Sequence, residues 1–286
     1  MQVTARGLYE QAKKSLAENG IDSANYDSLL LIEKCLGMSR QDIILYGDRY
    51  ISDDKRLEFE QLVDQRVSGI PLQYILGSWE FFGLPFKVGK GVLIPRADTE
   101  ILVETVIDNS AHIKAPIIAD LCAGSGAIGI SLAKNMQAKK IFLIEKSKDA
   151  LPYLIENISL NNASCCEAVE GDIFNCCDMF EDASIDIIVS NPPYIESDII
   201  KTLQKEVQYE PKSALDGGSD GLDFYKCIAD KWRAKLKPNG ILAFEIGETQ
   251  AQQVASIMEN NGYTGIKIVK DYAQNDRVVW GILKND

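Results

Sequence analysis

Three segments in the middle of the chain are apolar at almost every position, and this feature limits the fold more than any other. IIADL, IFLIE and IDIIVS belong to strands expected at 117–121, 140–145 and 185–190. A strand without polar alternation is buried on both faces, as in a parallel sheet covered by helices on both sides. Helical patterns alternate with these strands, at 99–108, 127–136 and 148–161. This part of the chain is therefore predicted to be α/β, with a doubly wound, mostly parallel sheet.

The C-terminal part continues the pattern and then departs from it. We expect a helix near 221–236, a strand at ILAFEI, a helix at 248–260 and two last strands, IKIVK and RVVWGIL. The turn-prone DYAQND separates these two strands. They are therefore expected to form an antiparallel hairpin at the edge of the sheet.

The N-terminal part has a different character. Helices are expected at 4–18, at 23–35, after Ser39 and at 52–67, which predicts a small helical bundle. Between 79 and 94, short apolar runs are broken by glycine and proline, a pattern typical of a β-hairpin. We therefore expect three parts: a helical domain at 1–77, a hairpin linker at 78–96 and a sheet domain at 97–286.

The charge and the cysteine content narrow the possible functions. Forty-two acidic and thirty basic residues give a net charge of -12, which disfavours a nucleic-acid substrate, because such binding depends on Lys and Arg neutralising phosphates. Seven cysteines are an odd number, which favours reduced thiols. The doublets Cys165-Cys166 and Cys176-Cys177 lack the two-residue gap of a zinc knuckle, so we expect apolar packing and no metal site. A single histidine, His112, argues against histidine-based catalysis.

The composition is that of a folded, soluble protein. Hydrophobic residues make up 46% of the 286 residues and charged residues 25%. No run reaches the roughly 18 apolar residues of a membrane span. The start MQVTARGLYEQAKK lacks an apolar core followed by a cleavage site. We therefore expect a cytoplasmic protein that does not contact a membrane.

A glycine-rich turn joins the first central strand to the helix that follows it. In the segment DLCAGSGAIG, Gly124, Gly126 and Gly129 have the G-x-G-x-x-G spacing. Glycine lets the backbone turn tightly and lets a ligand approach without meeting a side-chain carbon. By itself the turn fits an S-adenosylmethionine site, a nicotinamide dinucleotide site or a plain strand-to-helix connection.

Two acidic residues stand at the ends of the next strands. Glu145 closes the strand 140–145, where a carboxylate can accept hydrogen bonds from both hydroxyls of a ribose. Asp172 follows the strand-like AVEG, at a place suited to contact with an adenine amino group. Each is otherwise a solvated or turn-forming acid. With the glycine turn, they predict an adenosine-binding site at the carboxyl edge of the sheet.

The sequence Asn191-Pro192-Pro193-Tyr194, directly after the strand 185–190, indicates the reaction. An amide or exocyclic amine is a weak nucleophile, because its nitrogen lone pair is conjugated with a neighbouring π system. The Asn191 side-chain oxygen and the Pro192 carbonyl can accept its two N–H bonds, so that the lone pair faces a methyl donor. The prolines fix the loop, and Tyr194 offers a flat face to a planar group. The structural alternative is a rigid turn.

Four segments of the chain stand out together: GIPLQYILG at 69–77, LIPRADTE at 93–100, NPPY at 191–194 and EPKSALDGGSDGL at 210–222. With these segments the chain resembles the HemK-like family of protein-(glutamine) methyltransferases, which modify class I peptide release factors. The resemblance implies a Rossmann-like S-adenosylmethionine-dependent methyltransferase domain, with a mostly parallel seven-stranded sheet ending in an antiparallel hairpin. It also implies that the helical domain helps dock the release factor, and that the methyl acceptor is the side-chain amide nitrogen of the glutamine in a Gly-Gly-Gln loop.

The family pattern assigns these roles to particular residues of this chain. Asn191, Pro192 and Tyr194 would be catalytic, and the same residues with Pro193 would bind the substrate amide. S-adenosylmethionine, with S-adenosylhomocysteine as product, would contact Cys122, Ala123, Gly124, Ser125, Gly126, Glu145, Asp172, Ile173 and Asn191. The partner would be a class I release factor, bound by a monomer of this chain.

Two departures from the family pattern fall within this set. The family usually has Gly-Thr where Cys122-Ala123 stands, and an aromatic residue at the adenine wall where Ile173 stands. We expect these changes to alter the affinity for the cofactor without abolishing activity.

Two further segments keep alternative interpretations. Arg96, Asp98 and Glu100 either begin a helix, with Asp98 capping a helix that starts at Thr99, or lie near the mouth of the site and order the linker. The stretch 216–221 is either a flexible loop or a rim facing the substrate. The alternative function is an amino-methyltransferase acting on a base in DNA or ribosomal RNA. A methyltransferase-like binding module is the non-enzymatic alternative.

Overall fold

One sheet of seven strands organises the C-terminal part of the protein. The computed structural model describes residues 3–284. The strand order is β5-β4-β3-β6-β7-β9-β8. The bounds are β3 Ile117–Leu121, β4 Lys140–Glu145, β5 Cys166–Glu170, β6 Ile185–Ser190, β7 Leu236–Glu245, β8 Tyr263–Lys270 and β9 Asp276–Leu283. Strands β3 to β7 pair in parallel, whereas β9 is antiparallel to both its neighbours, which confirms the predicted sheet and its terminal hairpin.

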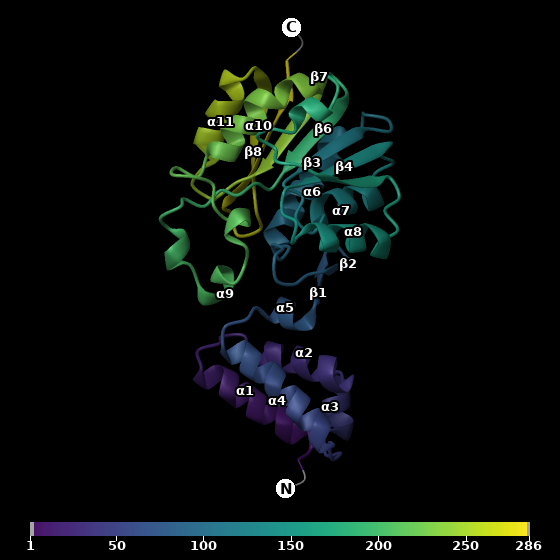
Figure 1. Ribbon diagram of the computed structural model, residues 1–286, viewed down its shortest axis with the longest axis vertical. Helices are drawn as coiled ribbons and strands as arrows, with labels where there is room; N and C mark the ends of the chain where they lie inside the picture. The colour runs from purple at the N-terminus through teal and green to yellow at the C-terminus, as the bar shows by residue number, and fades with distance from the viewer. Residues whose placement is uncertain (1–2, 285–286) are drawn as a thin grey trace. The chain divides into compact units, whose positions relative to one another are not determined.

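Helices cover both faces of this sheet, as Figure 1 shows. The helices are α6 Glu100–Ser110, α7 Ala127–Asn135 and α8 Leu151–Leu160 on one face, and α10 Asp223–Lys231 and α11 Ala251–Asn260 on the other. Leu102, Leu132 and Leu154 belong to the core on the first face, and Trp232 and Met258 to the core on the second. The strands are continuously apolar because each of their faces is buried against helices.

The boundaries of some elements differ from the prediction. α8 starts at Leu151, because residues 147–150 form a turn in which the Ala150 N–H donates to the Ser147 carbonyl. α11 starts at Ala251 after a similar turn, in which Gln250 N–H donates to the Gly247 carbonyl. Short 3-10 turns occur at Ala97–Thr99, Cys177–Met179, Ile200–Thr202, Lys212–Ala214 and Arg233–Lys235.

The N-terminal part is a bundle of five helices, one more than predicted. They are α1 Ala5–Glu18, α2 Ala24–Leu36, α3 Arg40–Tyr46, α4 Asp53–Val67 and α5 Leu72–Leu76. Ser39 and Asp42 form a capping box at the start of α3, which satisfies backbone N–H groups that the helix leaves open. Leu16, Leu31 and Phe59 are fully or almost fully buried in the shared core. The unpredicted helix α5 is only five residues long, too short for helical periodicity to be recognised.

A β-hairpin follows the bundle. It consists of β1 Ser78–Phe81 and β2 Leu84–Lys87. The two turn residues, Phe82 and Gly83, both have positive φ (52° and 70°), as a tight two-residue hairpin turn requires. Asn157 of α8 fastens this hairpin: its Oδ1 accepts from Lys87 N at 2.6 Å, and its Nδ2 donates to the carbonyls of Lys87 (3.1 Å) and Ser125 (3.0 Å).

The chain forms two compact units, and the smaller one has two separate parts. It comprises the residues up to Ser78 together with Gln204–Tyr209, which include the short helix α9, Lys205–Gln208. The buried Arg66 donates to Asp27 at 2.6 Å and to Glu206 at 2.5 Å. No pattern in the sequence predicts that residues 204–209 belong to the helical unit. Within residues 3–284, no helix has the length and apolar character needed to span a bilayer.

Candidate active site

A cavity of about 460 Å³ lies at the carboxyl ends of the central strands. β3 and β6 are neighbours, while the chain first proceeds from β3 to β4 on the other side, so the strand order reverses here. Ligands of open α/β sheets bind at such a point. The predicted site residues that line the cavity are Cys122, Ala123, Gly124, Ser125, Glu145, Asp172, Ile173, Asn191 and Pro193. Three others, Gly126, Pro192 and Tyr194, do not line it.

The glycine turn owes its shape to close packing. Gly126 has a φ of 82°, and a Cβ atom there would lie 2.6 Å from a methyl carbon of Leu154. At Gly129 a Cβ atom would lie 2.1 Å from a methyl carbon of Leu143, so glycine allows α7 to approach the sheet. The buried Asp120 accepts a hydrogen bond from Gly129 N at 2.9 Å. These two glycines therefore place the start of α7 rather than contact the cavity.

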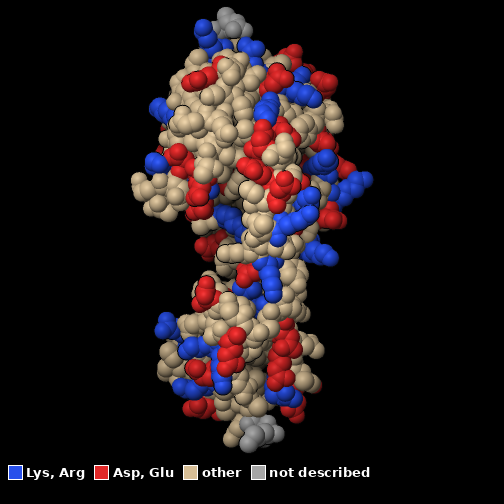
Figure 2. Space-filling model, turned by 90° about the vertical axis from the view of Figure 1, so that its left-hand side faces the viewer, with Lys and Arg blue, Asp and Glu red and all other residues tan. Residues whose placement is uncertain are grey.

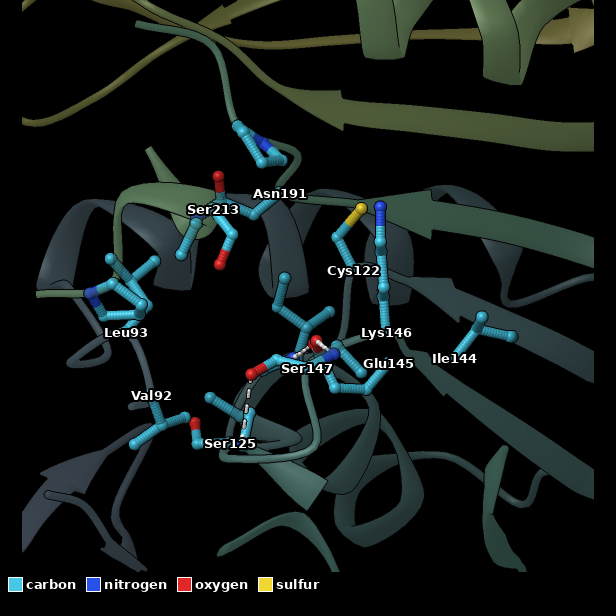
Figure 3. Close-up of a pocket in the computed structure, with 18 of the residues that line it drawn as sticks. Val92, Leu93, Cys122, Ser125, Ile144, Glu145, Lys146, Ser147, Asn191 and Ser213 are labelled. Atoms are coloured by element: carbon cyan, nitrogen blue, oxygen red, sulfur yellow. Dashed lines mark hydrogen bonds between the residues drawn. The ribbon is translucent and has the colours of Figure 1, made fainter. Parts of the chain in front are cut away.

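Glu145 fastens the same turn from the end of β4. Its Oε2 accepts from Gly124 N at 2.7 Å, and its Oε1 accepts from Ser147 N at 2.6 Å. Burial raises the pKa of the Glu145 carboxyl, although these backbone hydrogen bonds oppose the shift. Figure 3 shows these bonds on one side of the cavity and Asn191 on the opposite side. Each carboxylate oxygen keeps further acceptor capacity, as the predicted contact with ribose hydroxyls requires.

Asp172 follows β5, and its carboxylate forms an ion pair with Lys146. Burial favours a higher pKa for this carboxyl, but the Lys146 ammonium at 2.8 Å and the N–H of Phe174 outweigh it, so the pKa of Asp172 is lowered. Ile173 also lines the cavity, and its carbonyl accepts from Trp232 Nε1 at 3.0 Å. An aromatic side chain is nevertheless present, because Phe224 reaches the cavity from α10.

Asn191 stands directly after β6. Its Nδ2 donates a hydrogen bond to the Oγ1 of Thr99, at 3.2 Å. Thr99 precedes α6, is 4% exposed and lines the same cavity. With Nδ2 engaged by the protein, the Oδ1 of Asn191 is the atom left to accept hydrogen bonds from a ligand.

The loop after Asn191 is held by its own contacts. The Tyr194 carbonyl accepts from Gln250 Nε2 at 3.0 Å. Gly217 lies so close to this loop that a Cβ atom there would be 2.7 Å from the Cα of Tyr194. The Tyr194 ring packs against the core of the second face, and burial raises the pKa of its hydroxyl. Tyr194 therefore has a packing role here, while its predicted contact with a substrate remains a prediction.

The contacts of segment 96–100 favour a place near the mouth of the site, where it orders the linker, over a capped helix start. The N-cap prediction for Asp98 is wrong, because a 3-10 turn over Ala97–Thr99 precedes α6 and no side chain caps the helix. The Asp98 carboxylate instead lies 3.6 Å from Arg277. Arg96 lines the cavity and forms an ion pair with Glu210, while Glu100 accepts from Phe82 N at 2.8 Å. Glu100 therefore holds the start of α6 to the hairpin turn, while Arg96 and Asp98 hold this segment to Glu210 and to β9.

The rim at 216–221 is partly ordered by Asp216. Its Oδ1 accepts from Ser197 Oγ at 2.6 Å and from Gly218 N at 3.1 Å, and the residue lines the cavity. This arrangement favours a defined rim over a flexible loop. No group of three or more His, Cys, Asp or Glu side chains is placed to hold a metal ion in the part of the chain that the structure describes.

Two residues beside Asn191 were missed by sequence reasoning. For Thr99 the sequence indicates only a place at the start of a helix. Glu245 ends β7 as Glu145 ends β4, so the argument from a strand-end acid applied equally to it. It is 2% exposed and lies near Asn191 and Thr99.

Comparisons with known proteins agree in pointing to methyltransferases. A family model described as the PrmC N-terminal domain matches residues 8–77, and one described as the methyltransferase small domain matches residues 96–218. The release factor glutamine methyltransferase of Fusobacterium nucleatum is 41% identical over 274 residues, covering 95% of this chain and 77% of that protein. The protein of the same name from Clostridium botulinum is 40% identical, covering 92% and 94%.

Solved structures share the fold at low sequence identity. The hMettl16 catalytic domain, solved with an RNA hairpin, has a TM-score of 0.59 at 15% identity, covering 84% of this chain and 87% of that one. A methyltransferase from Pyrococcus furiosus has a TM-score of 0.54 at 18% identity, covering 72% and 91%. Together with the sheet order, they establish the fold as that of a Rossmann-like methyltransferase.

Proposed function

This chain belongs to the family of release factor glutamine methyltransferases, and from that premise we propose that it methylates the side-chain amide nitrogen of a glutamine. The methyl donor is S-adenosylmethionine. The acceptor is the glutamine of the Gly-Gly-Gln loop in a class I peptide release factor. The relatives named for this activity match nearly the whole chain, which supports the proposal for both units.

The observation that carries the proposal is the hydrogen bond from Asn191 Nδ2 to Thr99. An amide acceptor brings two N–H donors and needs two oxygen acceptors opposite them. The bond to Thr99 leaves Asn191 Oδ1 for one donor. The carbonyl of Pro192, the next residue, is our proposed second acceptor, although Pro192 itself does not line the cavity. When both N–H groups of the substrate amide donate to these oxygens, the nitrogen is favoured in the pyramidal form that attacks a methyl carbon.

The cavity fits an adenosine-containing methyl donor. Its volume lies in the range of roughly 300–1,000 Å³ usual for small-molecule sites. A Cβ atom at Gly124 would meet nothing within 4 Å, so a ligand can approach the backbone there. Glu145, Asp172 and Phe224 would hold the ribose and the adenine. S-adenosylmethionine supplies a methyl group on a sulfonium sulfur, which is electrophilic enough that no side-chain base is needed before transfer.

The charge distribution favours a protein acceptor over a nucleic acid. Lys and Arg are interspersed with Asp and Glu on the face seen in Figure 2, and the whole chain carries a net charge of -12. Nucleic-acid substrates are usually met by a continuous basic surface.

The proposal is tested by following a labelled methyl group. The chain is incubated with methyl-labelled S-adenosylmethionine and, separately, with a purified release factor, DNA and ribosomal RNA, and mass spectrometry locates the label. We expect label on the loop glutamine, and none on a release factor with alanine at that position. Label on a nucleic acid, with the release factor unmodified, would refute the proposal.

The role of Asn191 is tested by Asn191→Ala. We expect kcat to fall roughly 100- to 1,000-fold, as when one transition-state hydrogen-bonding group is removed, because the bond strengthens as the amide pyramidalises. Calorimetry should show a much smaller loss in the binding of S-adenosylmethionine, because Asn191 is one of several expected cofactor contacts. An unaltered kcat would exclude Asn191 from the reaction.

A further inference from the structure

The strand beside the one that carries Asn191 ends in a buried glutamate. β6 and β7 pair in parallel with Ser190 opposite Phe244, so Asn191 and Glu245 are the next residues of the two strands. Glu245 is 2% exposed, and among the described residues its Oε2 atom has no hydrogen-bond partner. A buried carboxylate with an unpaired oxygen is costly to fold. Its presence next to the proposed catalytic residue therefore calls for a role.

Hydrogen-bond directions connect the two residues through Thr99. The Thr99 hydroxyl accepts from Asn191 Nδ2, so its own hydrogen is free to point elsewhere. Glu245 stands beside Asn191 in the register of β6 and β7, and Thr99 and Asn191 both lower the pKa of its carboxyl, as nearby hydrogen-bond donors do. An ionised carboxylate can only accept hydrogen bonds. It therefore selects the arrangement in which the Asn191 N–H groups face the protein interior and Oδ1 faces the cavity.

We propose that Glu245, together with Thr99, is a positioning residue that fixes the orientation of the Asn191 side-chain amide for catalysis. The inference rests on the proposed function, because it assigns a task only if Asn191 binds an acceptor amide. If the Asn191 side-chain amide were rotated so that Nδ2 and Oδ1 exchanged places, which we call the inverted amide, its N–H groups would face the N–H groups of the substrate glutamine. The acceptor would then lose one of its two oxygen partners, and the nitrogen lone pair would no longer be directed.

The surroundings of Glu245 make its control of the Asn191 orientation sensitive to pH. The titratable groups that influence or face it are Asp98 and Arg277, and the phenols of Tyr194 and Tyr225. Burial raises the pKa of Glu245 to about 7, while Thr99, Arg277 and Asn191 lower it and Asp98 raises it. Protonated Glu245 gains an O–H donor and tolerates the inverted amide. The ionised form is the positioning form, so kcat should rise with pH through this range.

The test compares Glu245→Gln with a matched pair at Thr99. Glu245→Gln keeps the shape but adds two N–H donors, and Thr99→Val removes the hydroxyl while keeping the shape. Thr99→Ser restores the hydroxyl and is the control for Thr99→Val. We expect the Gln and Val variants to lose roughly 10- to 100-fold in kcat, the range for groups that orient another group through a hydrogen bond. Thr99→Ser should keep most of the activity.

Two further measurements separate positioning from a loss of structure. The Kd of S-adenosylmethionine should change much less than kcat in all three variants, because the predicted cofactor contacts other than Asn191 are kept. The rise of kcat with pH near 7 should disappear in Glu245→Gln. If Glu245→Gln does not fold, the comparison of kcat between Thr99→Val and Thr99→Ser tests the positioning role.

The outcomes distinguish this inference from the proposed function. A wild-type chain that methylates no release factor overturns both. An active wild type with unchanged kcat and pH profile in Glu245→Gln overturns the inference alone. Equal kcat for Thr99→Val and Thr99→Ser does the same.

Discussion

Cys122 has a backbone conformation that favours glycine. Its φ is 64°, in the left-handed region, where a side-chain carbon costs roughly 1–2 kcal/mol. We therefore expect Cys122→Gly to raise the free energy of unfolding by about 1 kcal/mol. Cys122→Ala is the matched control, since it removes the thiol but keeps the strained Cβ. Urea unfolding of the three proteins measures the effect, and a glycine variant no more stable than the alanine variant would contradict it.

Asp120 should make the stability of the protein depend on pH. Burial raises the pKa of this carboxyl to about 7 from its ordinary 3.8; the Gly129 N–H opposes the shift and Glu145 adds to it. Between these values the folded state holds a proton that the unfolded state has released. The contribution of Asp120 to the free energy of unfolding is therefore present at low pH and is lost as pH rises to about 7.

The variant Asp120→Asn isolates this contribution. Asparagine keeps an oxygen for the Gly129 N–H and carries no charge at any pH. The difference in stability between variant and wild type should grow by a few kcal/mol between about pH 4 and pH 7, in favour of the variant. Denaturant unfolding at a series of pH values measures it. Parallel pH curves for the two proteins would show that Asp120 does not titrate as described.

At the scale of elements, Asn157 of α8 makes the largest set of side-chain hydrogen bonds to the hairpin and its neighbours, beside single bonds from Asn161 and Glu100. Asn157 is fully buried and makes three hydrogen bonds, two to Lys87 and one to Ser125. Asn157→Ala leaves these backbone groups unpaired and should lower the free energy of unfolding by roughly 3 kcal/mol. The control is Asn109→Ala, which removes an amide that donates to the Thr105 carbonyl of its own helix. A loss no larger than that of the control would contradict the anchoring role.

The elements that could be predicted are those whose signal lies in neighbouring residues. Strands β3, β4 and β6 have the predicted bounds, because burial on both faces makes them continuously apolar. Helix α5 and the excursion at 204–209 were missed, since short elements and contacts between distant segments leave little periodicity. The cavity residues at strand ends were predictable from their position. Glu245 is also a strand-end acid and could have been found in the same way, but its place beside Asn191 depends on the register between β6 and β7. Thr99 could not be found, because its importance depends on a contact with Asn191, which is distant in the sequence.

At the scale of the whole molecule, the smaller unit depends on a buried ion pair. Arg66 is 3% exposed and Asp27 2%, and Glu206 joins them from the second segment of the unit. Removing one partner of a buried pair leaves an uncompensated charge and typically costs about 3–5 kcal/mol. We expect Arg66→Ala to destabilise the helical unit by this amount. Calorimetric unfolding should show the transition of that unit shifted to lower temperature.

Two controls accompany Arg66→Ala. Arg56→Ala removes a surface pair with Glu60 and should cost only about 0.5 kcal/mol. The double change Arg66→Met with Asp27→Leu removes both buried charges and should recover most of the loss. Equal effects of Arg66→Ala and Arg56→Ala would show that the buried pair does not stabilise the unit.

The return of residues 204–209 to the helical unit limits how this protein can be recombined. The boundary near residue 78 suggests a cassette that could be exchanged between relatives by a single splice. Such a chimaera would inherit Glu206 and Tyr209 from one parent and Arg66 and Ser68, to which they bond, from the other. Functional grafts should therefore require that both stretches come from the same parent, so the helical unit and its distant hexapeptide are expected to change together among relatives.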